Sequence, residues 1–306
     1  MNQLFKTYLI NNSLSGLSSI HKSDLHNHFG KGGNINYIRT LTKEKINMPP
    51  NRFESLAHMD EWFQNNIKIH CPYIQRLEAG FVQAASDNIS VLAASFGYAD
   101  KEFIDTMTSY NEKFAPNTRL LPELAFGRDC DTDYELSRLD EILSYNWFKS
   151  IDINGDEKAQ PIKNFKKIYR KAKEYGLRLK AHVGEFGKAD DVMEAVEELE
   201  LDEVHHGIAA ANSRFVMNWL SKHKIQLNIC PSSNVKLGLV ESYSVHPIRK
   251  LYDNGIPVTI NTDDMLIFNQ SVSEEYLNLI TAGLMNPDEL DDIRETGLRE
   301  LEYYID

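Results

Sequence analysis

The chain has few of the residues that build disulfide-stabilised or membrane-spanning proteins. Its 306 residues include only three cysteines, Cys71, Cys130 and Cys230, which are far apart in the sequence. Without a paired spacing, they favour neither a disulfide framework nor a cysteine zinc site. No apolar run approaches the length that spans a bilayer, and the first residues lack the pattern of a signal peptide. We therefore expect a soluble, cytoplasmic protein with reduced thiols and no membrane partner.

Positive charge is also in short supply. The 33 lysines and arginines face 45 aspartates and glutamates, which gives a formal net charge of -12, and the basic residues are scattered along the chain. Proteins that bind a nucleic-acid backbone gather their basic residues into a patch or stripe. We therefore expect no nucleic-acid partner, whereas the sequence leaves the oligomeric state open.

Eight short runs that are rich in apolar and β-branched residues predict strands. They lie at 23–28, 89–96, 119–126, 147–153, 177–183, 203–207, 225–230 and 257–264. Segments with helical spacing of apolar residues lie between them, for example at 161–176 and 191–200. Strands that alternate with helices pair in parallel through right-handed crossovers. A count of eight predicts an α/β fold of the (β/α)8 TIM-barrel type, with an open doubly wound sheet as the alternative.

The segment 34–87 is too long for a single crossover and contains the break Pro49-Pro50. We expect extra helices there, lying over the carboxyl-terminal mouth of the barrel. No linker, low-complexity tract or repeat divides the chain, so residues 1–306 are expected to form a single domain.

Histidines and carboxylates gather at the predicted ends of the strands. His26 and His28 are two residues apart in a strand, so their side chains point to the same face. Because the active site of such a barrel lies at the carboxyl ends of its strands, the polar residues there are candidates. They are His26, His28, Asn154, Gly155, Asp156, Glu157, His182, Glu185, His205, His206, Asp263 and Asp264. Three imidazoles and a carboxylate among them would suit zinc.

Each candidate also has a structural explanation. His182 could be a core histidine, Glu185 a solvated acid, and Asp264 the cap of the next helix. That all the candidates fall at strand ends favours a shared site. The other histidines are expected outside it; they are His21, His58, His70, His223 and His246.

Seven short blocks carry the candidate residues and their neighbours. They are LHNH (25–28), SIDINGDE (150–157), AHVGE (181–185), HHG (205–207), CPSSNVKLG (230–238), HP (246–247) and TINTDD (259–264). In this order and spacing they resemble the adenosine deaminase family of the amidohydrolase superfamily. The resemblance implies a hydrolytic deaminase of adenosine or a similar aminopurine, whether nucleoside, nucleotide or base, which releases ammonia by attack of a zinc-bound hydroxide.

The resemblance also implies a role for each matching residue. The implied zinc ligands are His26, His28, His182 and Asp263. Glu185 matches the acid that protonates the purine ring nitrogen next to the attacked carbon. His206, together with Asp263, matches the pair that orients the zinc-bound water. Asp264 and Gly155 match groups that hydrogen-bond the two edges of the purine.

One zinc ion per chain is expected. Two-metal members of the superfamily bridge their ions with a carboxylated lysine at the end of the fourth strand, and here that strand ends in residues 152–154, Asp-Ile-Asn. Lys180, on the fifth strand, is expected to be structural. The other zinc deaminase design, with its Pro-Cys-x-x-Cys signature, has no match in the sequence.

The loop after the second histidine departs from the family pattern. Members that act on adenosine usually carry an acid that binds a ribose hydroxyl at the place of Gly30. The glycines of GKGG (30–33) and the charge of Lys31 would suit an anion such as a 5′-phosphate, and a flexible turn with Lys31 in water is the alternative. The second strand, AASFGYAD (93–100), also lacks the arginine-containing block of relatives. We expect an aminopurine whose substituent differs from plain ribose, with adenosine as the default.

Two other functions stay open on the sequence alone. An amidohydrolase acting on a C–N bond of a non-purine would need the zinc ligands but not the residues that match the purine edges. A non-catalytic binding protein on the same scaffold would have no use for Glu185.

Overall fold

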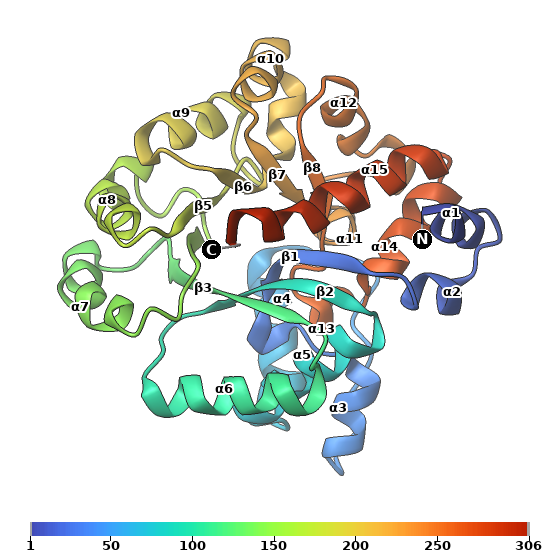
Figure 1. The fold of residues 1–306 in the computed structure, drawn as a ribbon, viewed down its shortest axis with the longest axis horizontal. Coiled ribbons are helices and arrows are strands. Elements are labelled where there is room, and N and C mark those ends of the chain that lie inside the picture. The colour runs from blue at the N-terminus through green and yellow to red at the C-terminus, as the bar shows by residue number, and fades with distance from the viewer. Residues whose placement is uncertain (1, 305–306) are drawn as a thin grey trace.

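The computed structural model describes residues 2–304 and contains one eight-stranded parallel sheet (Figure 1). The strands are β1 (Lys22–His28), β2 (Ile89–Phe96), β3 (Arg119–Gly127), β4 (Ser150–Asn154), β5 (Arg178–Val183), β6 (Glu203–His206), β7 (Gln226–Ile229) and β8 (Val258–Ile260). They pair in sequence order from β1 to β8. A bridge between Asn27 and Asp263 brings β1 beside the residues that follow β8, so the barrel is nearly closed. The prediction of a (β/α)8 barrel is confirmed.

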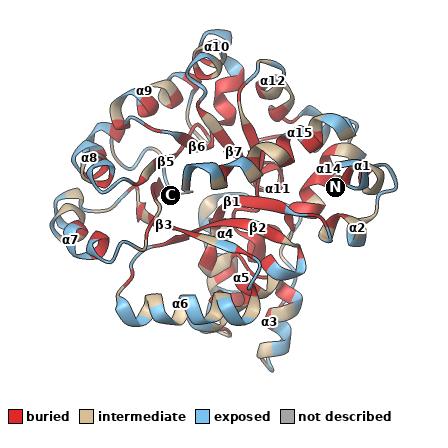
Figure 2. Ribbon diagram, in the orientation of Figure 1, coloured by how far each residue is buried: buried red, intermediate tan, exposed pale blue. Residues whose placement is uncertain are grey.

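Helices follow the strands and surround the barrel (Figure 1). The crossovers contain α5 (Tyr73–Ser86), α6 (Lys101–Phe114), α7 (Thr132–Ser144), η3 (Ile162–Phe165), α8 (Lys166–Glu174), α9 (Ala189–Leu199), η4 (Ile208–Asn212), α10 (Arg214–His223), α11 (Pro231–Lys236), η5 (Tyr243–Val245) and α12 (Ile248–Asp253). The longer helices, such as α5, α9 and α10, have both buried and exposed residues, as Figure 2 shows. Among residues 2–304, no helix combines the length and the apolar character that a membrane span needs.

Two strands are shorter than the sequence suggests. β4 starts at Ser150 rather than at Trp147, because Trp147 packs outside the sheet against Phe96 and Phe103. β8 ends at Ile260, although the strand was predicted to continue to Asp264. Asp263 has a φ of 62°, a left-handed conformation that a strand does not accommodate.

The amino-terminal end of the barrel is filled by the last helices of the chain. These are α15 (Pro287–Leu298) and η6 (Arg299–Tyr304), the dark red helices across the middle of Figure 1. Leu298 and Leu301 pack there against the interior cluster of Leu25, Val91 and Leu121. α1 (Asn2–Ile10), α2 (Leu14–Ser18) and α14 (Val272–Thr281) pack beside them.

The segment between β1 and β2 contains the extra helices that were predicted. They are η1 (Phe29–Lys31), α3 (Ile35–Leu41), α4 (Leu56–Phe63) and the π-helical turn η2 (Gln64–Lys68). Ile38, Phe63 and Ile67 of this segment form a buried cluster with Leu266 and Phe268 of α13 (Met265–Phe268). Because α13 follows β8, the extra segment lies over the carboxyl-terminal end of the barrel.

Candidate active site

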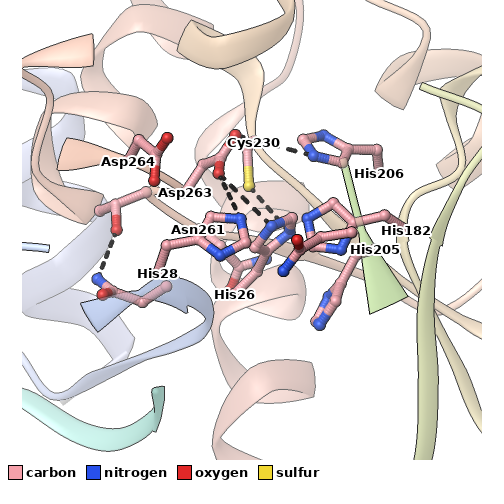
Figure 3. Close-up of polar contacts among 12 residues, drawn as sticks. His26, His28, His182, His205, His206, Cys230, Asn261, Asp263 and Asp264 are labelled. Atoms are coloured by element: carbon pink, nitrogen blue, oxygen red, sulfur yellow. Dashed lines mark hydrogen bonds and ion pairs between the residues drawn. The ribbon is translucent and has the colours of Figure 1, made fainter. Parts of the chain in front are cut away.

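The side chains of three strand-end histidines converge on Asp263 (Figure 3). Asp263 Oδ1 lies 3.3 Å from His28 Nε2 and 3.7 Å from His26 Nε2, and Asp263 Oδ2 lies 3.8 Å from His206 Nε2. One ring nitrogen each from His26, His182 and His206, and an oxygen of Asp263, lie within 4.8 Å of one another. Side chains from the ends of β1, β5, β6 and β8 therefore meet at one point, and His28 lies beside this group, in contact with Asp263.

Two ring nitrogens at this point have no hydrogen-bond partner. His26 Nε2 and His182 Nε2 are buried and unpaired among the described residues. A buried polar atom without a partner costs free energy, typically about 1–3 kcal/mol. Imidazole nitrogens and a carboxylate are the ligands that zinc and similar metal ions accept. The residues present therefore fit a bound metal ion, which would supply the missing partner.

Residues of the barrel contact the other ring nitrogen, Nδ1, of His26, His28 and His182. His182 Nδ1 lies 2.9 Å from Asp152 Oδ1, and His28 Nδ1 lies 3.1 Å from Ser95 Oγ. His26 Nδ1 faces the Asn228 carbonyl at 3.3 Å and Cys230 Sγ at 3.4 Å. Such contacts fix the orientation of each ring and direct Nε2 toward the shared point. Burial lowers the pKa of His182, but the charge of Asp152 outweighs burial and raises it to about 9, so Asp152 stabilises a positive charge on this ring, either a proton or a metal ion bound in its place.

A chain of hydrogen bonds fixes the tautomer of His206. The Ile248 N–H donates to His246 Nδ1 at 3.1 Å, which leaves His246 Nε2–H to donate to Asn234 Oδ1 at 3.2 Å. The amide nitrogen of Asn234 then donates to His206 Nδ1 at 3.3 Å. Burial and the neighbouring histidines hold the pKa of His206 well below its usual range. His206 is therefore neutral, with its Nε2–H directed at the cluster.

Two histidines lie differently from what the sequence suggests. His246 was expected outside the site, yet it is buried directly behind His206, in contact through Asn234. His205 was placed with the strand-end residues, but its Nε2 contacts Glu123 Oε1 at 3.2 Å inside the barrel. Its ring packs against that of His26, with centroids 4.1 Å apart. Neighbouring residues of a strand point to opposite sides, and the positive φ of His206 turns its side chain toward the cluster instead.

Glu185 lies beside His206, with Oε2 3.6 Å from His206 Nε2. Burial, followed by the charge of Asp263, raises the pKa of Glu185 well above its usual range, so its surroundings favour the protonated form of this acid. The loop that carries it is fixed by Glu157. The Glu157 carboxylate accepts hydrogen bonds from the backbone N–H groups of Gly184, Glu185 and Phe186, at 2.8, 2.9 and 2.7 Å. Glu157 was collected only as a strand-end acid, and its support of this loop was missed.

A cavity of about 440 Å³ opens beside the cluster. The barrel contributes Gly155, His182, Glu185, His206, Asp263 and Asp264 to its wall. The extra segment and α5 contribute Gly30, Lys31, Phe63, Lys68, Tyr73 and Arg76. The candidate catalytic, purine-contacting and loop residues therefore share one cavity.

The loop residue Lys31 occupies neither of the two positions considered for it. Its ammonium lies 2.8 Å from Asp264 Oδ2 and 5.6 Å from the centre of the Phe63 ring. Lys31 is thus paired with Asp264 at the cavity wall, and its side chain is only partly exposed. Asp264 stands before α13, but its side chain makes no capping hydrogen bond, so it faces the cavity rather than the helix.

Sequence comparison with known proteins shows the family of the chain. The sequence profile of adenosine deaminase matches residues 101–300. A Treponema pallidum protein named, provisionally, an adenosine/adenine deaminase is 30% identical over 287 residues, which cover 89% of this chain and 95% of that protein. An adenosine deaminase of Yersinia pseudotuberculosis is 31% identical over 164 residues, 53% of this chain. The chain spans 49% of the length of that relative.

Solved structures of related enzymes share the fold. An adenine deaminase from Arthrobacter aurescens superposes with a TM-score of 0.79 at 23% identity and covers 91% of this chain and 92% of its own. A zinc-bound amidohydrolase from Burkholderia ambifaria gives 0.73 at 20%, with 94% and 86% covered. An N6-methyl-AMP deaminase from Arabidopsis thaliana gives 0.73 at 16%, with 94% and 92% covered.

The contact between Asp152 and His182 predicts that Asp152 strengthens metal binding. Asp152→Asn replaces the carboxylate beside His182 Nδ1 with a neutral amide, so the ring becomes a poorer metal ligand. Metal affinity should fall by about 10- to 100-fold, the usual cost of removing such a partner. Competition with a chelator of known affinity measures it. Asp156→Asn, which removes an exposed carboxylate in the following loop, is the control. Equal affinity in Asp152→Asn and the control would show that Asp152 does not act through His182.

The buried His246 makes stability depend on pH. Burial lowers its pKa to about 3, whereas an unfolded histidine has a pKa of about 6.5. The unfolded chain alone binds the proton between these values, so stability is full above pH 6.5 and falls with decreasing pH. Between pH 7 and pH 5 this one group should cost about 2 kcal/mol of unfolding free energy.

Urea unfolding at pH 7 and pH 5, with a metal chelator present throughout, measures that cost. His246→Gln should lose about 2 kcal/mol less than the wild type over this range, because glutamine does not titrate. His223→Gln, at an exposed helix end, is the matched control and should behave as the wild type. An unchanged pH dependence in His246→Gln would contradict the buried neutral state of His246.

Proposed function

The chain belongs to the adenosine deaminase family, and from this we propose that it binds one zinc ion through His26, His28, His182 and Asp263 and deaminates an aminopurine. It is an adenosine/adenine deaminase-like enzyme, so the alternative of a non-catalytic protein is set aside. The observation that carries the proposal is the convergence of histidine nitrogens without hydrogen-bond partners and a carboxylate beside the buried Glu185. Adenosine, its nucleotide, the free base or a close analogue is the proposed substrate, with ammonia released.

Zinc suits the donor set better than a harder metal ion. Imidazole nitrogens predominate, and Mg²⁺ or Ca²⁺ would require mainly oxygen ligands. One structural relative binds zinc. When bound, zinc lowers the pKa of a coordinated water from 15.7 to about 7, which supplies a hydroxide nucleophile at neutral pH.

Glu185 is the proposed proton donor. Attack on the amino-bearing carbon disrupts the aromatic ring and leaves negative charge on the adjacent ring nitrogen. A carboxylic acid at that nitrogen can neutralise the charge, and the raised pKa of Glu185 favours the protonated form that this role needs. The three backbone hydrogen bonds to Glu157 hold this acid in place.

His206 and Asp263 are the proposed orienting pair. The neutral His206 donates from Nε2, so it can hold the attacking oxygen and stabilise the charge that remains on it after attack. Asp263 lies between His206 and the other histidines and accepts a proton or hydrogen bond from the same oxygen. Their contribution is orientation of the nucleophile toward the ring.

Asp264 and Gly155 are the proposed contacts to the two edges of the purine. Both line the cavity, Gly155 after β4 and Asp264 after β8, strands that lie on opposite sides of the barrel. Lys31 extends this part of the site, because its ammonium is hydrogen-bonded to Asp264. Gly30 and Lys31 therefore contribute to substrate binding through the purine-facing wall, and these contacts favour a purine over a non-purine amide.

A screen for ammonia release tests the proposed function. Zinc-loaded protein is incubated with adenine, adenosine, AMP and N6-methyl-AMP, the compounds or close analogues named for its relatives, and with non-purine amides as controls. We expect release from at least one purine, and none from metal-stripped protein or His182→Ala. Release from amides alone would favour the non-purine amidohydrolase, and two equivalents of tightly bound metal would contradict the single-ion proposal.

Glu185→Gln separates catalysis from binding. The amide cannot donate a proton to the ring nitrogen as a carboxylic acid does, so kcat should fall by at least about 10²-fold. Zinc content and KM should change little, because Glu185 is not among the proposed ligands. Glu194→Gln, in α9, removes a carboxylate away from the cavity lining and should leave kcat unchanged. Normal turnover by Glu185→Gln would mean that another group supplies the proton.

A further inference from the structure

We infer that the wall of the cavity formed by α4, η2 and α5 binds the phosphate of a phosphorylated aminopurine nucleoside, with Arg76 as its principal contact. The inference rests on the proposed deaminase function, since it identifies what is attached to the purine. It places the anion beside Arg76 of α5, and not beside Lys31.

Arg76 is a buried cation without an acidic partner. Its residue is 6% exposed, it lines the cavity, and its Nε has no hydrogen-bond partner. The contact recorded for its guanidinium nitrogens is a long one, 3.4 Å from Nη1 to the Cys71 carbonyl. Among residues 2–304, no carboxylate lies within ion-pair distance of it. A buried charge without a counterion is costly, so a ligand anion is the natural partner.

Two aromatic rings hold the guanidinium in place. Its central carbon lies 5.2 Å from the centre of the Phe63 ring and 5.5 Å from that of Tyr73, and both rings line the same cavity. Arginine stacks on aromatic faces while its N–H groups remain free at the edge. That planar fork matches two oxygens of a phosphate. The site is therefore held in position before any ligand arrives.

The absence of a side chain at Gly30 makes this arrangement possible. A Cβ there would lie 2.6 Å from the Tyr73 ring, closer than real contacts allow. Any larger residue at position 30 would displace Tyr73, and with it one of the two rings that hold Arg76. The GKGG loop therefore favours an anion indirectly, through the aromatic ring packed on it.

The remaining charges of this wall leave Arg76 as the principal cation. Lys31 Nζ forms an ion pair with Asp264 Oδ2 at 2.8 Å. Lys68 is exposed and lines the cavity, so it can add a second positive charge. Asp60 also lines the cavity, where it accepts a hydrogen bond from Gln64 Nε2 at 3.2 Å. A doubly charged phosphate gains most from such a site, whereas adenine and adenosine leave Arg76 without a counterion.

Binding and turnover of matched substrates test the inference. Affinities of adenosine, 5′-AMP and 3′-AMP are measured by calorimetry, and kcat/KM by ammonia release, for the wild type, Arg76→Met and Arg138→Met. Arg138 is the matched control, because its guanidinium also lies over two tyrosine rings, Tyr98 and Tyr134, outside the cavity lining and paired with Glu135. Arg76→Met keeps the apolar stem and removes only the charged fork.

We expect one of the two nucleotides to bind the wild type more tightly than adenosine does. In Arg76→Met the ratio of nucleotide to adenosine affinity, and of their kcat/KM values, should fall at least about 10-fold, as for a lost charged hydrogen bond. Arg138→Met should keep the wild-type ratio. A wild type that prefers adenosine, or a ratio unchanged in Arg76→Met, would overturn the phosphate site.

The two proposals fail separately in this experiment. If the wild type binds a nucleotide through Arg76 but releases no ammonia from any purine, the deaminase function is wrong and the phosphate site stands. If it deaminates purines with the same preference in the wild type and Arg76→Met, the function stands and the phosphate site is wrong.

Discussion

The candidate site depends on the backbone pairing between β1 and the turn that follows β8. The Asp263 N–H donates to the His26 carbonyl at 2.9 Å, and the His28 N–H donates to the Asp263 carbonyl at 3.2 Å. The contact that closes the barrel therefore also brings the proposed metal-binding residues together. Asp263 and His206 both have a φ of 62°, a conformation that costs about 1–3 kcal/mol where a non-glycine residue holds it. The surrounding barrel maintains this strain, and both side chains point to the cluster because of it.

A layer of charged residues lies in the barrel interior near the histidines. Lys180 lies 3.5 Å from Glu123 and 3.3 Å from Glu203, and Glu123 contacts His205. Asn228 connects this layer to the histidine cluster, since its amide donates to Glu203 at 2.7 Å and its carbonyl faces His26. A buried layer whose partners are all present restricts the side chains above it to one arrangement. The histidine rings thus lie between a fixed ionic layer and an open cavity.

Sequence patterns predicted the barrel, the extra helices and the residues that meet at the cluster. The strand periodicity was sufficient because eight buried runs can alternate with helices in few ways. The orientation of individual side chains was harder to predict from the sequence. His205 and His206 are neighbours, and the side chain of His206 points to the cavity only because its φ is positive. The supporting contacts of Asp152, Asn234 and His246 join residues far apart in the chain, and no local spacing indicates them. The sequence also does not indicate Arg76 as a binding residue, because its role depends on the rings of Phe63 and Tyr73, which pack against it only in the folded protein.

We propose that one zinc ion binds where the histidine nitrogens meet Asp263. Anomalous diffraction from crystals of the zinc-loaded protein, collected on both sides of the zinc absorption edge, locates the ion directly. We expect one strong peak per chain, about 2.0–2.2 Å from Nε2 of His26, His28 and His182 and from a carboxylate oxygen of Asp263. A second peak of equal height, a peak ligated by other residues such as the Asp152–His205 pair, or no peak at this position would contradict it.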